Sequence, residues 1–364
     1  MLIDLIAGAR PNFMKIASII RAIEKRAEIS EAFGYRLVHT GQHYDQNMSA
    51  TFFSQLGIPE PDVNLGVGSG TQAEQTAGIM TAYENLLLEK PCNLCVVVGD
   101  VTSTMSCAIT SQKLKIKVAH VEAGIRSNDW SMPEEINRMV TDSISNYCFT
   151  TSENANQNLI SLGVPKDRIF FVGNTMIDTL FNNMDRFCKP LFWDELHLQK
   201  QDYFVLTLHR PGNVDEAENF ISLLTTIGKG ARGKTIVYPV HPRSAKNLSS
   251  FGSLPSNIAI IEPQPYLEFN YLVQNAKAVI TDSGGITEET TVMGIPCMTL
   301  RNSTERPETI SMGTNELVGT EPENLIPYLD CLFQGNWKEG KIPPKWDGKT
   351  GDRIVGHIEE ILLS

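Results

Sequence analysis

Residues 276–289 read AKAVITDSGGITEE, a short apolar run followed by a polar, glycine-rich turn. The apolar run predicts a buried parallel strand, and helical spacing resumes from Thr287 to Met293. At such a junction, free backbone N–H groups and the positive end of the helix dipole attract an anion, which glycines allow to approach closely. The stretch therefore predicts a phosphate site, to which Ser283 adds a hydroxyl donor. An ordinary capped helix after a strand is the alternative that these residues leave open.

Strand-like apolar runs alternate with helical patterns from the first residue to about Val318, without hairpin turns or a repeat period. Such alternation is typical of parallel sheets covered by helices. We expect strands near residues 2–7, 35–39, 94–98, 117–121, 147–150 and 169–172, and then near 203–208, 235–239, 258–261, 278–281 and 296–299. The predicted fold class is α/β, with two Rossmann-like, doubly wound domains that face each other across a cleft.

A chain of 364 residues is longer than one core usually supports, so two domains are expected. The segment 186–202, which contains Pro190, is the best candidate for the hinge region. We therefore expect an N-terminal Rossmann-like domain over residues 1–186 and a C-terminal one over 187–350. The final segment, 351–364, is expected to form a helix that returns to the first domain.

Composition limits the possible functions of the chain. A net charge of −11 argues against broad nucleic-acid binding, although a local basic pocket for a small anion remains possible. No apolar run approaches the roughly 20 residues of a membrane span, and the first residues lack the basic region of a signal peptide, so we expect a cytoplasmic protein. Seven scattered cysteines, including the pair Cys92 and Cys95, favour reduced core residues over disulfides or a metal site.

Three acids are candidates for catalysis in the first domain. Asp100 and Glu122 each end a predicted strand, and Glu134 begins a helix with Arg138 on the same face. Carboxylates at these positions suit general acid/base chemistry without a metal ion. The alternatives are a helix N-cap for Asp100, pairing of Glu122 with Arg126, and a surface ion pair between Glu134 and Arg138.

Cations and histidines form a second group of candidates. Arg10 and Lys15 follow the first strand and offer a further place for an anion. His209 and His241 each end a strand of the second domain, and Arg306 follows the last predicted strand. Near the phosphate site, Arg306 is expected to help hold a diphosphate. Surface cations and satisfied histidines near a core are the alternatives.

In their joint order, the motifs of this chain resemble those of the bacterial non-hydrolysing UDP-N-acetylglucosamine 2-epimerases. The resemblance runs nearly end to end through residues 10–15, 40–43, 98–100, 120–124, 133–135, 137–138, 173–178, 209–210, 238–242, 282–289, 304–308 and 313–314. It implies a two-domain glycosyltransferase B architecture and reversible conversion of UDP-N-acetylglucosamine (UDP-GlcNAc) to UDP-N-acetylmannosamine (UDP-ManNAc). By family analogy, UDP is eliminated to leave an enzyme-bound 2-acetamidoglucal, and re-adds after C2 has been reprotonated on the other face. The resemblance also implies a homodimer and a role in cell-surface polysaccharide biosynthesis, with no cofactor and no metal ion.

The resemblance assigns roles to the matching positions of this chain. Those it places at the sugar are Asp100, Glu122, Glu134, His209 and Lys15. Those it places at the diphosphate, or elsewhere on the substrate, are Arg10, Arg138, His241, Ser283, Gly284, Gly285 and Arg306. Glu289, more than Glu288, is expected to hold the ribose hydroxyls. Which acid removes the C2 proton and which delivers one stays open.

The chain departs from the family pattern at several positions. The usual Arg-Pro-Glu turn is here Arg-Pro-Asn at 10–12, and the usual His-Arg-Arg-Glu-Asn is His-Arg-Pro-Gly-Asn at 209–213. Members activated by UDP-GlcNAc at a second site carry an Arg-Gln pair in the loop that here reads Gly-Ser-Gly-Thr at 68–71. We therefore hypothesise weak or altered substrate activation.

Four other functions compete with this assignment. A 2-epimerase of another UDP-2-acetamido sugar, such as a diacetamido uronic acid, would share the same acids. A hydrolysing epimerase that releases free ManNAc is disfavoured, because those relatives carry an Arg-Ala-Glu-Tyr type of turn where this chain has Arg10-Pro11 and Lys15. A glycosyltransferase would need an acceptor cleft, and a nucleotide-sugar sensor is expected to lack one or more of the three acids.

Overall fold

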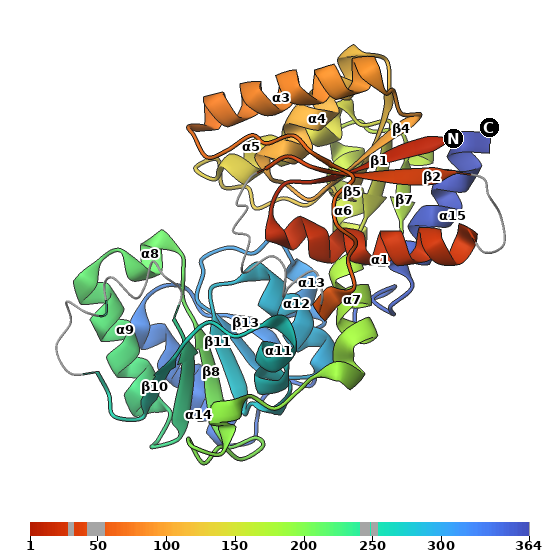
Figure 1. Ribbon diagram of the computed structural model, residues 1–364. Helices are drawn as coiled ribbons and strands as arrows, with labels where there is room; N and C mark the ends of the chain where they lie inside the picture. Colours follow the sequence, from red (N-terminus) through yellow and green to blue (C-terminus); the bar gives the residue numbers. More distant parts are fainter. Residues whose placement is uncertain (28–32, 42–54, 241–247, 249–253, 364) are drawn as a thin grey trace. The chain divides into compact units, whose positions relative to one another are not determined.

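The structure is a computed structural model that describes residues 1–27, 33–41, 55–240, 248 and 254–363. The chain divides into two compact units (Figure 1). Unit 1 consists of Met1–Asn182 and Pro344–Ser364, and unit 2 consists of Asn183–Pro343. Each unit contains one sheet in which all neighbouring strands run parallel, so the predicted α/β class is confirmed.

The sheet of unit 1 has seven strands in the order β3-β2-β1-β4-β5-β6-β7. Their bounds are β1 Leu2–Ala7, β2 Gly34–His39, β3 Val63–Asn64, β4 Leu94–Val98, β5 Lys117–Ala123, β6 Tyr147–Thr150 and β7 Ile169–Phe171. Every residue of β4 is fully buried, which accounts for its unbroken apolar sequence. The order reverses between β1 and β4, and such switch points are where open parallel sheets bind ligands.

Helices pack around this sheet (Figure 1). They are α1 Arg10–Ala27, α3 Gln72–Glu89, α4 Thr102–Lys113, α5 Pro133–Ile144, α6 Glu153–Ser161, α7 Thr175–Asn183 and α15 Thr350–Leu363. Helix α3 begins with a capping box, in which Thr71 and Glu74 bond to each other's backbone N–H groups. The loop at 68–71, where the family's activation residues are replaced, therefore ends at the N-cap of α3.

The sheet of unit 2 has six strands in the order β10-β9-β8-β11-β12-β13. They are β8 Tyr203–Thr207, β9 Thr235–Pro239, β10 Ile258–Ile261, β11 Ala278–Thr281, β12 Cys297–Thr299 and β13 Asn315–Leu317. Its helices are α8 Pro211–Val214, α9 Ala217–Gly230, α11 Tyr266–Asn275, α12 Gly284–Met293, α13 Pro307–Ser311 and α14 Leu325–Phe333. Short 3-10 turns at Lys166–Arg168, Met184–Arg186, Leu191–Trp193 and Pro322–Asn324 complete the described elements of the chain.

The C-terminal segment belongs to unit 1. Trp346 is fully buried and donates its indole N–H to the carbonyl of Thr151 at 3.0 Å. The backbone N–H of Gly351 donates to the Asp178 carboxylate at 2.7 Å, so a side chain of α7 caps the start of α15. Helix α15 also lies close against α1, since a Cβ on Gly351 would stand 2.4 Å from the carbonyl oxygen of Ser18.

The helix after the glycine-rich turn begins earlier than the sequence predicts. Helix α12 starts at Gly284 rather than Thr287, so Gly284 and Gly285 form its first turn. None of the helices in the described ranges combines the length and apolar character that crossing a bilayer requires.

Candidate active site

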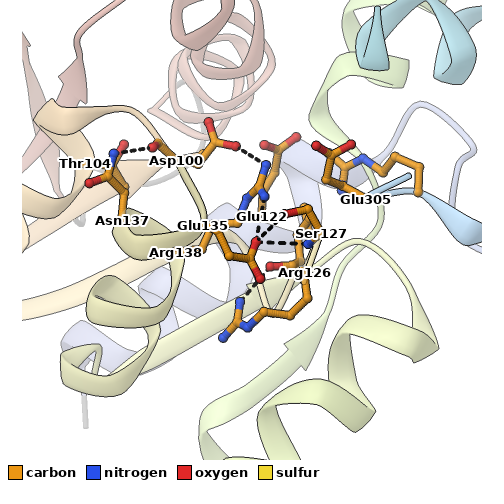
Figure 2. Close-up of polar contacts among 12 residues, drawn as sticks. Asp100, Thr104, Glu122, Arg126, Ser127, Glu135, Asn137, Arg138 and Glu305 are labelled. Carbon is orange, nitrogen blue, oxygen red and sulfur yellow. Dashed lines mark hydrogen bonds and ion pairs between the residues drawn. The ribbon is translucent and has the colours of Figure 1, made fainter. Parts of the chain in front are cut away.

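Asp100 follows strand β4, and Glu122 lies near the end of the neighbouring strand β5 in unit 1. Val98 and Val121 are partners in the register of β4 and β5, so the two acids lie side by side at the carboxyl edge of the sheet. The Arg138 guanidinium from α5 reaches the Asp100 carboxylate at 2.5 Å (Figure 2). Asn137 of the same helix donates to the Asp100 carbonyl at 2.8 Å. The N-cap of α4 is Val101, so the alternative role of Asp100 as a helix cap is wrong.

Glu122 occupies a bulge in β5 and has a left-handed backbone with φ of +69°. Such a φ costs a residue with a Cβ about 1–2 kcal/mol, and bulges beside functional sites commonly redirect a side chain. Its carboxylate is almost fully buried and forms an ion pair with Lys15 of α1. Gly99 lies against this pair, because a Cβ there would stand 3.1 Å from Lys15 Nζ and 3.5 Å from Glu122 Oε2.

Two predicted alternative ion pairs are absent from the described residues. Arg126 pairs with Asp142 at 2.6 Å rather than with Glu122. Arg138 contacts Asp100 and, at 2.9 Å, Glu135, rather than Glu134. Glu134 itself is half-buried in the first turn of α5, with no ion-pair partner in the described part of the chain.

Glu135 is a structural residue that the sequence analysis missed. Its carboxylate accepts the backbone N–H of Ser127 at 2.9 Å (Figure 2). It also accepts the backbone N–H of Asn128 at 3.1 Å. Burial alone would raise the pKa of Glu135, but these bonds and Arg138 lower it overall. Glu135 therefore stays ionised and anchors the loop that leads into α5.

Asn12, where the family pattern has glutamate, is also structural. It is 2% exposed, accepts the backbone N–H of Ala9 at 2.9 Å and donates to the carbonyl of Val98 at 2.8 Å. An amide can donate and accept at once, which a carboxylate cannot. The Asn12 side chain therefore links the turn before α1 to the end of β4.

His209 and Asp282 meet at the ends of β8 and β11 in unit 2. Asp282 is fully buried, and its carboxylate lies 2.7 Å from His209 Nδ1. The same carboxylate accepts the backbone N–H of Arg210 at 2.9 Å and the side-chain amide of Asn213 at 3.0 Å. Burial would raise the pKa of Asp282, but the His209 ring and these hydrogen bonds lower it overall. Asp282 lies in the glycine-rich stretch 276–289, where the local sequence pattern gives no sign of this role.

The two glutamates of α12 have different partners. Glu288 forms an ion pair with Arg306, and both side chains are largely buried. Glu289 accepts a hydrogen bond from the Tyr266 hydroxyl at 2.9 Å. Burial, together with the charge of Glu288, raises the pKa of Glu289 to about 7. Tyr266 opens α11 and was missed, because a lone tyrosine in an amphipathic helix carries no functional signal.

The start of α12 is only partly buried. Ser283 is the N-cap residue, but among the described residues its hydroxyl makes no capping bond, and Ser283, Gly284 and Gly285 are all half-buried. The Arg301 guanidinium, held by Glu305 at 2.8 Å, lies 3.8 Å from where a Cβ of Gly284 would stand. Arg301 is a missed cation that follows β12, as Arg306 does.

Unit 1 thus brings together Asp100, Glu122, Lys15 and Arg138, and unit 2 brings His209 close to the glycine-rich turn. His241 and the side chain of Arg10 lie outside the described part of the structure, although Arg10 begins α1. Within the described residues, no group of three or more His, Cys, Asp or Glu side chains is arranged to hold a metal ion. Burial raises the pKa of Cys95 to about 12, so the thiol of this C-x-x-C motif is a poor nucleophile.

Comparison with known proteins identifies the family. The model of the UDP-N-acetylglucosamine 2-epimerase family matches residues 25–359. The chain is 42% identical over 368 residues to a UDP-N-acetylglucosamine 2-epimerase of Methanocaldococcus jannaschii, covering 98% of both chains. It is 37% identical over 325 residues to a UDP-2,3-diacetamido-2,3-dideoxy-D-glucuronate 2-epimerase of Pseudomonas aeruginosa, covering 88% of this chain and 89% of the relative.

Solved structures agree with this result. The crystal structure of the M. jannaschii UDP-GlcNAc 2-epimerase in complex with UDP-GlcNAc and UDP matches with a TM-score of 0.86 and 40% identity, covering 99% of this chain and 100% of that one. A calicheamicin glycosyltransferase, at 12% identity and a TM-score of 0.55 over 100% of this chain and 98% of that one, shares the fold alone. The expected glycosyltransferase B type of fold is confirmed. The chain belongs to the UDP-N-acetylglucosamine 2-epimerase family of isomerases.

Proposed function

We propose that the protein interconverts UDP-GlcNAc and UDP-ManNAc by inversion at C2, without hydrolysis to the free sugar. The observation that carries this proposal is the pair of acids at the ends of β4 and β5, each held by a cation. Asp100 pairs with Arg138, and Glu122 pairs with Lys15. The family membership, and the UDP-GlcNAc bound in the structure of the M. jannaschii relative, support the choice of substrate.

The reaction needs groups of this kind because the C2 proton is only weakly acidic. A carboxylate that removes it must act together with stabilisation of the departing UDP, and an acid must then protonate C2 on the opposite face. Elimination leaves 2-acetamidoglucal and UDP, and re-addition of UDP gives the other epimer, so no external oxidant, reductant or water is consumed. Glu122, Asp100 and Glu134 are the acids that we assign to these proton transfers, and Lys15 and His209 keep the roles that the resemblance implies.

Unit 2 is the proposed holder of UDP. Its support is the partly buried start of α12, where backbone N–H groups, the Ser283 hydroxyl and the dipole all favour an anion. Arg306 and Arg301 supply positive charge, and Glu289 is assigned to the ribose hydroxyls. Arg10 and His241 keep the substrate-binding roles that the resemblance implies. A cytoplasmic homodimer, with its units forming the two expected domains, completes the proposal.

A deuterium experiment tests the function. The protein is incubated with UDP-GlcNAc in D2O, and products are followed by proton NMR. We expect UDP-ManNAc that carries deuterium at C2, with no free sugar. Free ManNAc would instead indicate hydrolysis. An unchanged substrate, despite tight UDP binding, would contradict the proposal.

A second candidate is a 2-epimerase of a UDP-2,3-diacetamido uronate. The similarity to the P. aeruginosa relative, over 88% of this chain, favours including it. Such an enzyme would use the same acids and differ at the groups that contact C3 and C6 of the sugar. Comparison of kcat/KM for the two UDP-sugars decides between them, because UDP-GlcNAc is the better substrate only under the first proposal.

A further inference from the structure

The ring of His120 is fully buried between two hydrogen-bond acceptors. His120 Nε2 lies 2.8 Å from the carbonyl oxygen of Gly99, and Nδ1 lies 2.7 Å from Asp142 Oδ1. A carbonyl can only accept, and so can an ionised carboxylate. Both acceptors are satisfied at once only if both ring nitrogens of His120 carry a proton, which makes the ring a cation.

Asp142 is ionised in this arrangement. It is 1% exposed, and burial alone would raise the pKa of its carboxyl group. The His120 ring and the Arg126 guanidinium reverse this and lower the pKa overall. Asp142 also accepts the backbone N–H of Gly124 at 3.1 Å, so one carboxylate faces two cations and one amide.

These contacts enclose the bulge that carries Glu122. His120 lies two residues before Glu122 and Gly124 two residues after it, and Asp142 holds both. Gly124 has a φ of +79°, and a Cβ there would stand 2.3 Å from the carbonyl oxygen of Ala155, so its backbone position is tightly limited. A left-handed φ at a glutamate persists only where the surroundings enforce it, and the Asp142 contacts supply that enforcement.

The same ring contacts the residue that precedes the second acid. The Gly99 carbonyl that accepts from His120 immediately precedes Asp100, and the Gly99 N–H donates to the carbonyl of Val121 at 3.0 Å. Helix α5, which supplies Asp142, also supplies the Arg138 that pairs with Asp100. One buried network therefore fixes both turns from which the proposed catalytic carboxylates project.

We propose that Asp142 is a positioning residue that, with a protonated His120, holds Glu122 and Asp100 in place for proton transfer. This inference rests on the proposed function for its catalytic consequence. Its structural content, a buried imidazolium between Asp142 and Gly99, does not depend on the substrate. Neither residue contacts the reacting sugar in this proposal.

Replacement of Asp142 by Asn tests the catalytic part. The amide keeps the shape of the carboxylate but removes its charge and one acceptor. We expect kcat to fall about 100-fold, the order of effect that misplaced reacting groups produce, while KM and the Kd for UDP change less than about threefold. The matched control is Asp178→Asn, which removes another buried carboxylate of the same unit, at the start of α15. The control should lower the melting temperature and leave kcat unchanged.

Equal losses of kcat in the two variants would mean a merely structural role and would overturn the proposal. So would an Asp142→Asn enzyme with normal kcat. A second measurement, on the wild-type protein, guards against a variant that does not fold. Nitrogen-15 NMR of labelled histidine, under the conditions of the activity assay, should show one ring with both nitrogens protonated, assigned by replacing each of the other six of the seven histidines. A neutral His120 ring would sink the proposal, whatever the deuterium experiment shows about the function.

Discussion

Each unit holds a histidine against a buried aspartate, and the two pairs differ in how far the ring is exposed. Both have a 2.7 Å contact between Nδ1 of the histidine and an aspartate oxygen. Asp142 also accepts the backbone N–H of Gly124, and Asp282 accepts that of His209 itself. The ring of His120 is completely enclosed, with Nε2 directed to a carbonyl. The ring of His209 is 45% exposed at the end of its strand.

This difference separates two uses of one chemical pair. A ring whose two nitrogens both face buried acceptors has no free nitrogen to offer a substrate, so His120 serves to position its neighbours. His209 is oriented by the contact between Nδ1 and Asp282, and much of its side chain is exposed. The pairing alone therefore does not identify a catalytic histidine, and exposure of the ring has to be considered with it.

The largest effect is expected for His209→Asn. If His209 transfers a proton or stabilises the leaving diphosphate, kcat should fall by about 10²–10⁴-fold, while an exposed ring contributes little to stability. Turnover measured by NMR and thermal melting of the same preparation check both statements. A variant that unfolds, or one with normal turnover, would contradict the distinction between a reacting His209 and a positioning His120.

Asp282→Asn comes next, with an expected loss in kcat of about 100-fold. An amide at this position no longer fixes the His209 ring with a proton on Nδ1, although it can still accept one backbone N–H. Nitrogen-15 NMR should show His209 in a mixture of tautomers in the variant. A single unchanged tautomer together with full activity would show that Asp282 supports only the loop after β8.

Glu289 contrasts with Asp142 and Asp282, because this buried carboxylate is hydrogen-bonded to a tyrosine rather than to a histidine. Its pKa is raised to about 7, so the folded protein keeps this proton to a higher pH than the unfolded chain does. The stability of the wild type should therefore fall relative to Glu289→Gln as pH rises from about 4.5 to 7. Above pH 8 the variant should unfold with a free energy about 1–3 kcal/mol higher.

The same variant should bind UDP about tenfold more weakly at pH 8, since a neutral amide is a poorer acceptor for ribose hydroxyls than a carboxylate. Urea unfolding and calorimetric titration with UDP measure the two effects separately. Equal stability of both proteins at pH 5 and pH 8 would mean that Glu289 titrates normally. Unchanged UDP affinity would remove Glu289 from the ribose site.

The smallest effect concerns activation by substrate, which depends on residues away from both histidine–aspartate pairs. These residues lie in the loop at 68–71 and in the turn after His209. Because Gly, Ser and Pro replace charged family residues there, we expect UDP-ManNAc kinetics with little sigmoidal character. Initial rates with and without a trace of UDP-GlcNAc provide the test. Strong sigmoidicity that the additive abolishes would show that activation survives these replacements.

The sequence predicts most of the fold, since buried parallel strands have continuous apolar runs. It fails at β3 and β13, which are edge strands of two and three residues with mixed polarity. It locates Asp100, Glu122 and His209 at strand ends, but not their partners. Glu122 meets Lys15 across 107 positions and His209 meets Asp282 across 73, and no local pattern reports such contacts.

The alternative ion pair between Glu134 and Arg138, inferred from their spacing in α5, is also wrong. A four-residue separation puts Glu134 and Arg138 on one face, but the guanidinium turns to Asp100 and Glu135, where it is buried. A partly desolvated ion pair gains more from charge than an exposed one, so tertiary contacts prevail over the helical spacing.

The return of α15 to unit 1 affects how the chain folds during synthesis. Residues 344–363 follow unit 2 in the chain, yet α15 lies against α1 and the segment supplies the buried Trp346. All of unit 2 is translated before them, so unit 2 is able to fold while the ribosome still holds the remaining segment. Unit 1 has its sheet before unit 2 in the chain and α15 after it, so unit 1 is completed only once unit 2 has been translated. A pause or truncation near residue 343 would therefore leave unit 2 intact and unit 1 incomplete.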